Sequence, residues 1–263
     1  MIPLPSFHVG GVRLDAARES DLVERVAAWA RARGDGRPRT VCFVNAFSIV
    51  SAAKDEPFRQ AINRSDLSVV DGVPVAWVGR RLVGGPCDRL SGPDLMHRLL
   101  SDVRFADIRH FVLGGEQGAL DRLEFRYSLG GTQTPRRIVG TYSPPFRPMT
   151  SAEESALVQR LDALKPDVVW VCFGTARQEK WMAATRHRVN AGVLAGVGAA
   201  VDFLSGNKSR APRWMQRLGL EWFFRLASEP RRLWRRYLIG NAQFMKLAAA
   251  ELWRSRSTRQ EHV

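Results

Sequence analysis

The sequence predicts an α/β fold, in which helices cover both faces of a mostly parallel sheet and a basic helical appendage follows. Three observations support this expectation. Apolar runs rich in β-branched residues alternate with amphipathic segments, as repeated βα units do. Runs such as VVWVCF are apolar at every position, which is typical of strands covered on both faces. The last quarter differs, because arginines there alternate with large aromatic and aliphatic residues.

The expected elements alternate along residues 1–206, which we assign to one Rossmann-like α/β domain. The apolar runs predict strands at residues 40–44, 67–70, 110–113, 137–139, 168–173 and 193–197. The amphipathic segments predict helices at residues 15–33, 46–54, 73–82, 93–103, 117–127, 152–164 and 177–188.

Residues 207–263 are assigned to the appendage. Pro212 is expected to open a short helix that ends at Gly219, because proline suits the first helical turn and glycine suits the end. Further helices are expected at residues 220–228 and 231–254. Residues at near-helical spacing predict an apolar stripe on the last helix that packs against the α/β core: Trp234, Leu238, Met245, Ala248 and Leu252.

The chain is strongly basic, and its charge is unevenly distributed. Its 263 residues can form one sizeable core with an appendage, and they carry a net charge of +14. Residues 208–263 hold 13 Lys or Arg against 4 Glu, which is +9 of that total, together with half of the tryptophans. Such a surface favours an anionic partner, namely nucleic acid, anionic lipid or a phosphorylated substrate. A solvated basic face without a specific ligand is the plainer alternative.

The cysteines and the N-terminal residues indicate a location. Cys42, Cys87 and Cys172 form no CxxC or His/Cys pattern, so no metal site is expected, and their odd number argues against a disulfide framework. A reducing, cytoplasmic compartment fits. The segment MIPLPSFHVGGVRLD lacks the pattern of a signal peptide, and no run of about 18 apolar residues predicts a membrane span. Membrane contact is therefore expected to be peripheral.

Glycines and polar residues follow the predicted strands, at the edge where open parallel sheets bind ligands. One such glycine alone is more simply a turn, but several together predict a ligand-binding rim. The rim comprises Asn45, Asp71 with Gly72, Gly114 with Gly115, Gly174 with Thr175, and Gly198.

Asp71 is the strongest candidate for chemistry. A carboxylate at a strand end, beside a glycine that admits a close ligand, is well placed as a general base. Asp71 also precedes Gly72-Val73-Pro74, where a helix can begin, so a helix N-cap is an equally good interpretation from position alone.

The segment GTARQEKWM, residues 174–182, predicts a second part of the rim. Gly174 and Thr175 form a strand-to-helix turn, where free N–H groups can bind phosphate or sugar oxygens, and Gln178 lies in the first helical turn. No G-x-G-x-x-G or Walker A pattern occurs, so a dehydrogenase or a P-loop NTPase finds no support.

Arg89, in DRLSGPDL, could neutralise a diphosphate or form an ordinary ion pair with Asp88 or Asp94. No D-x-D pair occurs, whereas many nucleotide-sugar enzymes hold a metal ion through one. Arginines and backbone N–H groups are therefore expected to meet the charge of a leaving group.

Taken in order, these motifs resemble the WecG/TagA/CpsF glycosyltransferases over about residues 40–237. The blocks that carry the resemblance are FVNAFSIVSAAKDEPFRQAINRSDLSVVDGVPVAW, DRLSGPDL, FVLGGE, IVGTYSPPF, KPDVVWVCFGTARQEKWM and VGAAVDFLSGNKSRAPRWMQRLGLEWFFRLASEPRRLWRRY.

The resemblance implies an inverting, metal-independent transfer of a sugar from a UDP-sugar to a sugar on a polyprenyl diphosphate, in surface polysaccharide biosynthesis. It implies no cofactor, and it places the protein peripherally on the inner face of a bacterial plasma membrane. N-acetylmannosamine is favoured as the donor sugar and glucose is the alternative. A homo-oligomer formed through the α/β core would also fit, and no nucleic-acid partner is implied.

The resemblance also assigns residues. It makes Asp71 the base, Asn45 an active-site amide, Arg89 a residue of the same pocket and Gln178 a residue that holds the donor. From their places at the strand ends, and not from the resemblance, Gly114, Gly115, Gly174 and Thr175 are expected to bind the donor or its diphosphate. Arg225, Arg232 and Arg235 of the appendage would bind the diphosphate.

Two positions depart from the family pattern. Phe43 replaces a threonine that the family often has two residues before Asn45, which removes a hydroxyl from the pocket floor. Ala176 replaces the proline of a GTPxQE pattern, which should loosen that turn.

The alternative function is that of a non-enzymatic protein that binds nucleic acid or an anionic membrane through the basic, aromatic appendage. No known RNA- or DNA-binding motif supports it.

Overall fold

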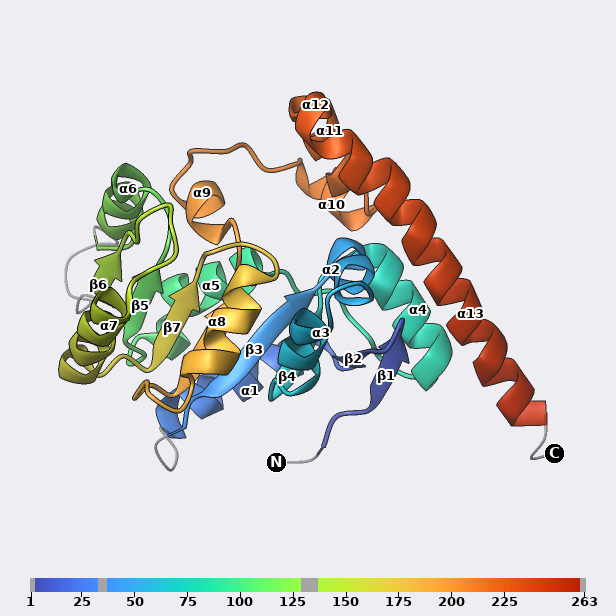
Figure 1. Ribbon diagram of the computed structural model, residues 1–263, viewed down its shortest axis with the longest axis horizontal. Coiled ribbons are helices and arrows are strands. Elements are labelled where there is room, and N and C mark those ends of the chain that lie inside the picture. Colours follow the sequence, from blue (N-terminus) through green and yellow to red (C-terminus); the bar gives the residue numbers. More distant parts are fainter. Residues whose placement is uncertain (1–2, 33–36, 129–136, 261–263) are drawn as a thin grey trace. The chain divides into compact units, whose positions relative to one another are not determined.

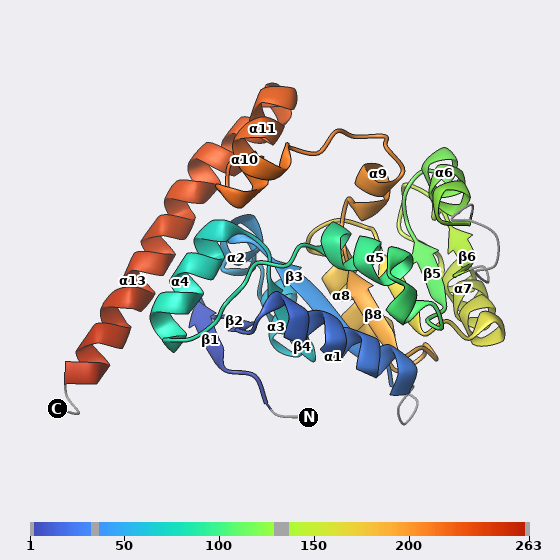
Figure 2. The same ribbon diagram turned by 180° about the vertical axis from the view of Figure 1, so that it is seen from behind.

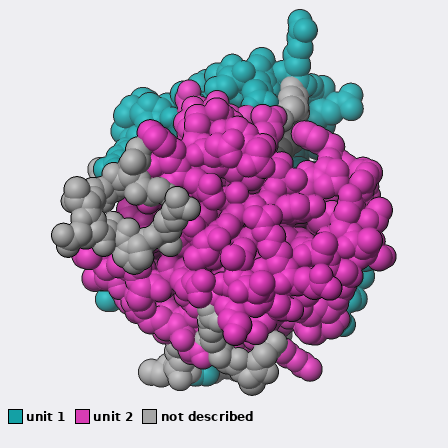
Figure 3. Space-filling view, turned by 90° about the vertical axis from the view of Figure 1, so that its left-hand side faces the viewer, with its two compact units in different colours: residues 1–19, 43–91, 210–263 teal, residues 20–42, 92–209 magenta. Residues whose placement is uncertain are grey.

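The computed structural model describes residues 3–32, 37–128 and 137–260, except the side chains of Ser128, Arg217, Arg232 and Arg236 and those of residues 258–260. The chain forms two compact units, which Figure 3 shows in different colours. Unit 1 comprises residues 1–19, 43–91 and 210–263, and unit 2 comprises residues 20–42 and 92–209. Residues 210–263 thus belong to the same unit as the segment that carries Asp71.

Unit 2 contains most of a parallel sheet. In strand order it runs β3 (Arg39–Val44), β8 (Val193–Gly196), β7 (Val168–Val171), β5 (His110–Leu113) and β6 (Ile138–Tyr142), and all neighbours are parallel. β3 ends in unit 1. Strands β5, β7 and β8 are buried at every position, as their apolar sequences predict.

Helices cover both faces of this sheet. Figure 1 shows α8 (Arg177–Thr185) in front of the strands, and Figure 2 shows α1 (Glu19–Ala32) and α5 (Gly92–Ser101) on the opposite face. The expected α/β class is therefore confirmed. The remaining elements of unit 2 are η1 (Val103–Phe105), α6 (Gln117–Ser128), α7 (Ser151–Leu164) and α9 (Ala200–Leu204).

Unit 1 begins with an antiparallel hairpin that was not expected. Strands β1 (Ser6–Val9) and β2 (Val12–Asp15) are joined by Gly10 and Gly11, both at positive φ, as a tight two-residue hairpin turn requires. The signal was present in the sequence, since SFHV and VRLD alternate around Gly-Gly. Because Asp15 ends β2, the helix expected from residue 15 begins instead at residue 19.

Strand β4 (Leu67–Val70) pairs in parallel with β2. The backbone N–H of Asp71 donates to the carbonyl oxygen of Val44, at 2.9 Å, which joins the ends of β4 and β3. Over the described residues the full strand order is β1-β2-β4-β3-β8-β7-β5-β6. The helices of this part are α2 (Ala46–Ala52), α3 (Glu56–Asn63) and α4 (Val73–Val83).

The appendage is helical, as expected. Its elements are α10 (Arg213–Arg217), α11 (Glu221–Ser228), α12 (Pro230–Trp234), the π-helical turn η2 (Arg235–Ile239) and α13 (Gly240–Gln260). Helix α13 packs along α2 and α4, which Figures 1 and 2 both show. Leu247 lies so close to Gly10 that a Cβ there would meet its Cδ1 at 3.0 Å. None of the helices in the described part of the chain is long and apolar enough to cross a bilayer.

The expected apolar stripe on the last helix is largely wrong. Trp234, Leu238 and Met245 are 43%, 56% and 60% exposed, and of the stripe only Ala248 is buried. The face that packs is formed by other residues, namely Leu233, Tyr237, Phe244 and Ala248. Since this helix is apolar on more than one face, its periodicity could not indicate which face is covered.

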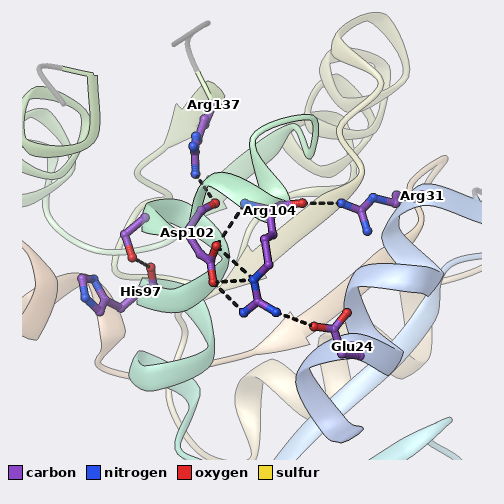
Figure 4. Close-up of polar contacts among 7 residues, drawn as sticks. Glu24, Arg31, His97, Asp102, Arg104 and Arg137 are labelled. Carbon is purple, nitrogen blue, oxygen red and sulfur yellow. Dashed lines mark hydrogen bonds and ion pairs between the residues drawn. The ribbon is translucent and has the colours of Figure 1, made fainter. Parts of the chain in front are cut away.

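Ion pairs join α1 to η1 within unit 2 (Figure 4). Arg104 pairs with Asp102 and Glu24, at 2.7 and 3.2 Å. Arg31 pairs with Asp107 at 2.7 Å. Arg31 also donates to the carbonyl oxygen of Arg104. These pairs are largely exposed, so solvent screens them and they add little to stability, and we interpret the cluster as structural.

Candidate active site

Asp71 lies directly after β4, with its side chain about one quarter exposed. The N-cap of α4 is Gly72, and no side chain caps that helix, so the N-cap interpretation of Asp71 is wrong. Gly72 has φ 136°, a conformation that L residues rarely adopt. The carboxylate of Asp71 is therefore not occupied as a cap and remains a candidate for chemistry.

Asn45 lies at the end of the neighbouring strand β3. Its side-chain oxygen accepts the backbone N–H of Ser48 at 3.0 Å and caps α2. The amide NH₂ group is not needed for that cap, so it can serve as a donor in the cavity described below. The hydrogen bond between Asp71 and Val44 holds the two strand ends together. Asn45 and Asp71 therefore lie at one edge of the sheet, as the sequence predicted.

Arg89 lies beside Asp71. Its Nε is 4.0 Å from Asp71 Oδ1, and its terminal nitrogens donate to Glu221 Oε2 at 3.3 Å and to the carbonyl oxygen of Gln216 at 3.5 Å. The guanidinium thus links the strand end that carries Asp71 to the appendage. Asp88, one of the partners considered for Arg89, accepts the backbone N–H of Glu19 instead.

A cavity of about 130 Å³ opens between these residues and the appendage, within unit 1. Pockets that enclose drug-sized ligands measure about 300–1,000 Å³, so this one suits a smaller group such as a sugar ring or a phosphate. The strand ends and α4 contribute Asn45, Ala46, Phe47, Asp71, Gly72, Val73, Pro74, Val75 and Arg89, and the appendage contributes Gln216, Gly219, Glu221, Trp222, Arg225, Tyr237 and Asn241.

The three arginines expected from the appendage differ in position. Arg225 lines the cavity. Arg235 is exposed and lies over the ring of Trp234, 5.2 Å from its centroid, so it does not line the cavity. The side chain of Arg232 lies outside the described residues. Of the three, Arg225 alone is described as part of this pocket.

The rim glycines of unit 2 follow β5 and β7, which are neighbouring strands. Gly114 and Gly115 have positive φ, and a Cβ at either would lie 2.9 Å from Cys172 or Val201, so close packing accounts for both. Gly174 also has positive φ, but its Cβ position faces open space. Gly174 and Thr175 therefore offer the more accessible backbone.

Gln178 is buried and fixes the end of β8. Its amide nitrogen donates to the carbonyl oxygen of Gly196 at 2.7 Å and to Glu179 Oε1 at 2.9 Å, and its oxygen accepts the N–H of Gly198 at 3.0 Å. Both amide hydrogens are thus used within unit 2. Its expected contact with the donor stays a prediction, and the geometry shows that it positions the loop after β8.

Glu179 is the unusual neighbour of Gln178. It is buried, and its Oε2 has no hydrogen-bond partner among the described residues. Burial raises the pKa of its carboxyl group to about 7. Glu179 therefore holds a proton more readily than an ordinary glutamate.

A family model described as "Glycosyl transferase WecG/TagA/CpsF family" matches residues 7–258. The chain belongs to this family of glycosyltransferases. Family membership favours an enzyme over the non-enzymatic alternative.

This glycosyltransferase is similar to the N-acetylglucosaminyldiphosphoundecaprenol N-acetyl-beta-D-mannosaminyltransferase of Bacillus subtilis (strain 168). The two are 29% identical over 195 residues, which cover 74% of this chain and 73% of the relative.

Several cavity residues of this glycosyltransferase were not expected from its sequence. They come from the appendage: Gln216, Glu221, Trp222, Tyr237 and Asn241. The sequence placed arginines and aromatics in this segment but gave no sign of which would face Asp71. Tyr237 lies in the π-helical turn, where the ordinary helical count does not apply.

Proposed function

We propose that this glycosyltransferase transfers N-acetylmannosamine from its UDP derivative to N-acetylglucosamine on a polyprenyl diphosphate, in the synthesis of a surface polysaccharide. The observation that carries the proposal is the cavity that Asp71, Arg89 and Arg225 line together. A carboxylate can accept a proton there, and guanidinium groups can bind a diphosphate. The name of the Bacillus subtilis relative supports both the sugar and the lipid acceptor.

The proposed reaction is one displacement with inversion. The acceptor hydroxyl oxygen attacks the anomeric carbon and forms the new C–O bond. The bond from that carbon to the β-phosphate oxygen breaks, and its electron pair leaves with UDP. Asp71 takes the hydroxyl proton. Transfer without a metal ion follows if arginines and backbone N–H groups stabilise the charge on the diphosphate.

We also propose that the enzyme works peripherally, on the cytoplasmic face of the plasma membrane. Its appendage exposes large apolar side chains among arginines, a combination that suits anionic lipid headgroups above an apolar layer. The exposed apolar residues are Trp214, Leu218, Phe223, Trp234, Leu238, Ile239, Met245 and Trp253.

The decisive experiment measures UDP release by the full chain in detergent with EDTA present. Donors are UDP-N-acetylmannosamine and UDP-glucose, each with and without a short polyprenyl diphosphate that carries N-acetylglucosamine. The proposal expects acceptor-dependent release with the first donor. Release with UDP-glucose alone would assign the other sugar, and no release with folded protein and intact acceptor would refute the proposed function.

Asp71→Asn tests the base. The amide keeps the shape of the side chain but cannot take a proton, so kcat should fall about 10²- to 10⁴-fold, while donor binding changes little. Asp88→Asn is the matched control, since Asp88 is exposed, does not line the cavity and accepts the backbone N–H of Glu19 through an oxygen that the amide keeps, and it should retain activity. An Asp71→Asn variant that keeps more than one third of the activity would rule out this role.

A further inference from the structure

Two arginines from separate segments of unit 1 converge on one carboxylate, that of Glu221. Arg89 approaches Glu221 Oε2 at 3.3 Å, and Arg210 approaches Oε1 at 4.0 Å. Arg210 also donates to Ser91 Oγ at 3.0 Å, which holds its guanidinium near Glu221. The side chains of Arg89, Arg210 and Glu221 are only 18%, 21% and 26% exposed.

This arrangement has the form of an anion-binding site. Guanidinium groups bind carboxylates and phosphates with the same fork of N–H donors, so a site built for one accepts the other. Arg89 and Arg210 would repel each other in a partly desolvated position without an anion between them. Glu221 supplies an anion to both arginines from the first turn of α11, and Asp71 Oδ1 lies 4.0 Å from Arg89 Nε on the other side.

A diphosphate would compete with Glu221 for the same donors. It carries more negative charge than one carboxylate, and it offers more acceptor oxygens to the two guanidinium groups. Glu221 lines the cavity together with Trp222 and Arg225 of the same helix. Displacement of the Glu221 carboxylate would therefore break the ion pair that joins α11 to Arg89.

We propose that Arg89 and Arg210 form a phosphate subsite, and that the carboxylate of Glu221 occupies it until a diphosphate displaces it. The proposal deepens the proposed function and rests on it, because that reaction supplies the diphosphates. It assigns a binding role to Arg210 and makes Glu221 an internal competitor of the substrate.

Calorimetric titration of the full chain with inorganic pyrophosphate, at constant ionic strength, tests the subsite. Glu221→Gln removes the competing charge and should tighten binding about tenfold, the order expected when one like charge leaves a partly buried ion site. Arg210→Gln removes a donor and should weaken binding about tenfold. Glu251→Gln is the matched control, because it makes the same charge change on α13 at a residue paired with Arg254, and it should bind like the wild type.

The two substitutions are expected to change pyrophosphate affinity in opposite directions, which a purely structural role of Glu221 does not predict. If Glu221 only ties α11 in place, Glu221→Gln weakens pyrophosphate binding or leaves it unchanged, and the proposal fails. The proposal also fails if Arg210→Gln binds pyrophosphate like the wild type. Circular dichroism and melting temperature show whether each variant is folded, and the Arg210→Gln result stands even where Glu221→Gln is unstable.

Two further titrations identify the source of the phosphate. Geranyl diphosphate presents a lipid diphosphate and UDP presents that of the donor, and the ligand that gains affinity in Glu221→Gln is the one that uses the subsite. Equal affinities for both ligands in Glu221→Gln and the wild type would refute the subsite. If pyrophosphate binding responds as expected but no sugar is transferred, the proposed function fails while the subsite stands. If sugar is transferred but pyrophosphate binding does not respond to the substitutions, the subsite is refuted and the proposed function stands.

Discussion

Ala176 adopts a backbone conformation that favours glycine. Its φ is 71° and its ψ is −40°, at the turn between β7 and α8. Residues other than glycine have strain there, because Cβ crowds the backbone. Proline cannot adopt this φ at all, since its ring holds φ near −65°. A proline at this position, which the family pattern has, would therefore require a different turn.

This strain predicts the effect of two substitutions. Ala176→Gly should raise the free energy of unfolding by about 1 kcal/mol, because it removes the Cβ contact. Ala176→Pro should lower it by at least as much, because the turn must be rebuilt. Urea denaturation followed by circular dichroism measures both. A stabilising proline would show that the turn has negative φ in solution.

Glu179 predicts a dependence of stability on pH. Its pKa is raised from 4.5 to about 7 by burial, so the folded protein binds the proton more tightly than the unfolded chain does. The contribution of protonated Glu179 to the free energy of unfolding is fully present below about pH 4.5 and is lost as the pH rises through about 7. The whole effect is about 3 kcal/mol at most.

Glu179→Gln should remove the fall in the free energy of unfolding between about pH 4.5 and 7, because an amide keeps the hydrogen bond from Gln178 but does not ionise. Urea midpoints at pH 5, 6, 7 and 8 compare the variant with the wild type and with Glu116→Gln, an exposed control in unit 2. An unchanged pH profile in Glu179→Gln would mean that Glu179 is ionised at neutral pH.

At the scale of elements, the exposed apolar side chains of the appendage predict membrane binding. Trp214 and Leu218, at α10 and its end, are 59% and 65% exposed. Replacing both by serine should lower partition onto vesicles that contain anionic lipid by roughly tenfold, since each side chain loses part of its transfer free energy. Vesicle sedimentation measures this.

The control for this prediction is Phe146→Ser, which removes an apolar side chain that is 96% exposed in unit 2. It should not alter partition. Equal losses in both variants would mean that the appendage has no special part in membrane contact.

The sequence predicted most strands of the sheet, because the buried strands of βα units are visible in a sequence as long apolar runs. It also predicted that Asn45 and Asp71 share an edge, because both follow parallel strands. It could not predict which appendage residues complete the cavity, since Glu221 and Tyr237 reach it only through tertiary packing. The hairpin at Gly10-Gly11 and the N-cap of α3 at Asp55 were readable but were missed.

At the scale of the whole molecule, the division into units predicts the effect of truncation. Residues 210–263 cover α2, α4 and β1 within unit 1, so a chain of residues 1–209 should lose this cover along with its activity. Hydrogen exchange should accelerate in residues 43–91, while β5, β7 and β8 remain protected. Full protection of residues 43–91 would show that the expected boundary at residue 206 separates independent domains.

Unit 1 is assembled from three stretches of chain that are far apart in sequence. During synthesis the ribosome releases Asn45, Asp71 and Arg89 early, but their cavity lacks a wall until residues 216–241 have emerged. A domain formed by one continuous stretch of chain can fold while translation continues. Unit 1 cannot complete its folding until residues 210–263 have been synthesised. A nascent or prematurely stopped chain would carry the proposed base without the surfaces that close around it. Until residues 216–241 have been synthesised, the growing chain therefore has the strand-end residues of the cavity without the appendage residues that line it.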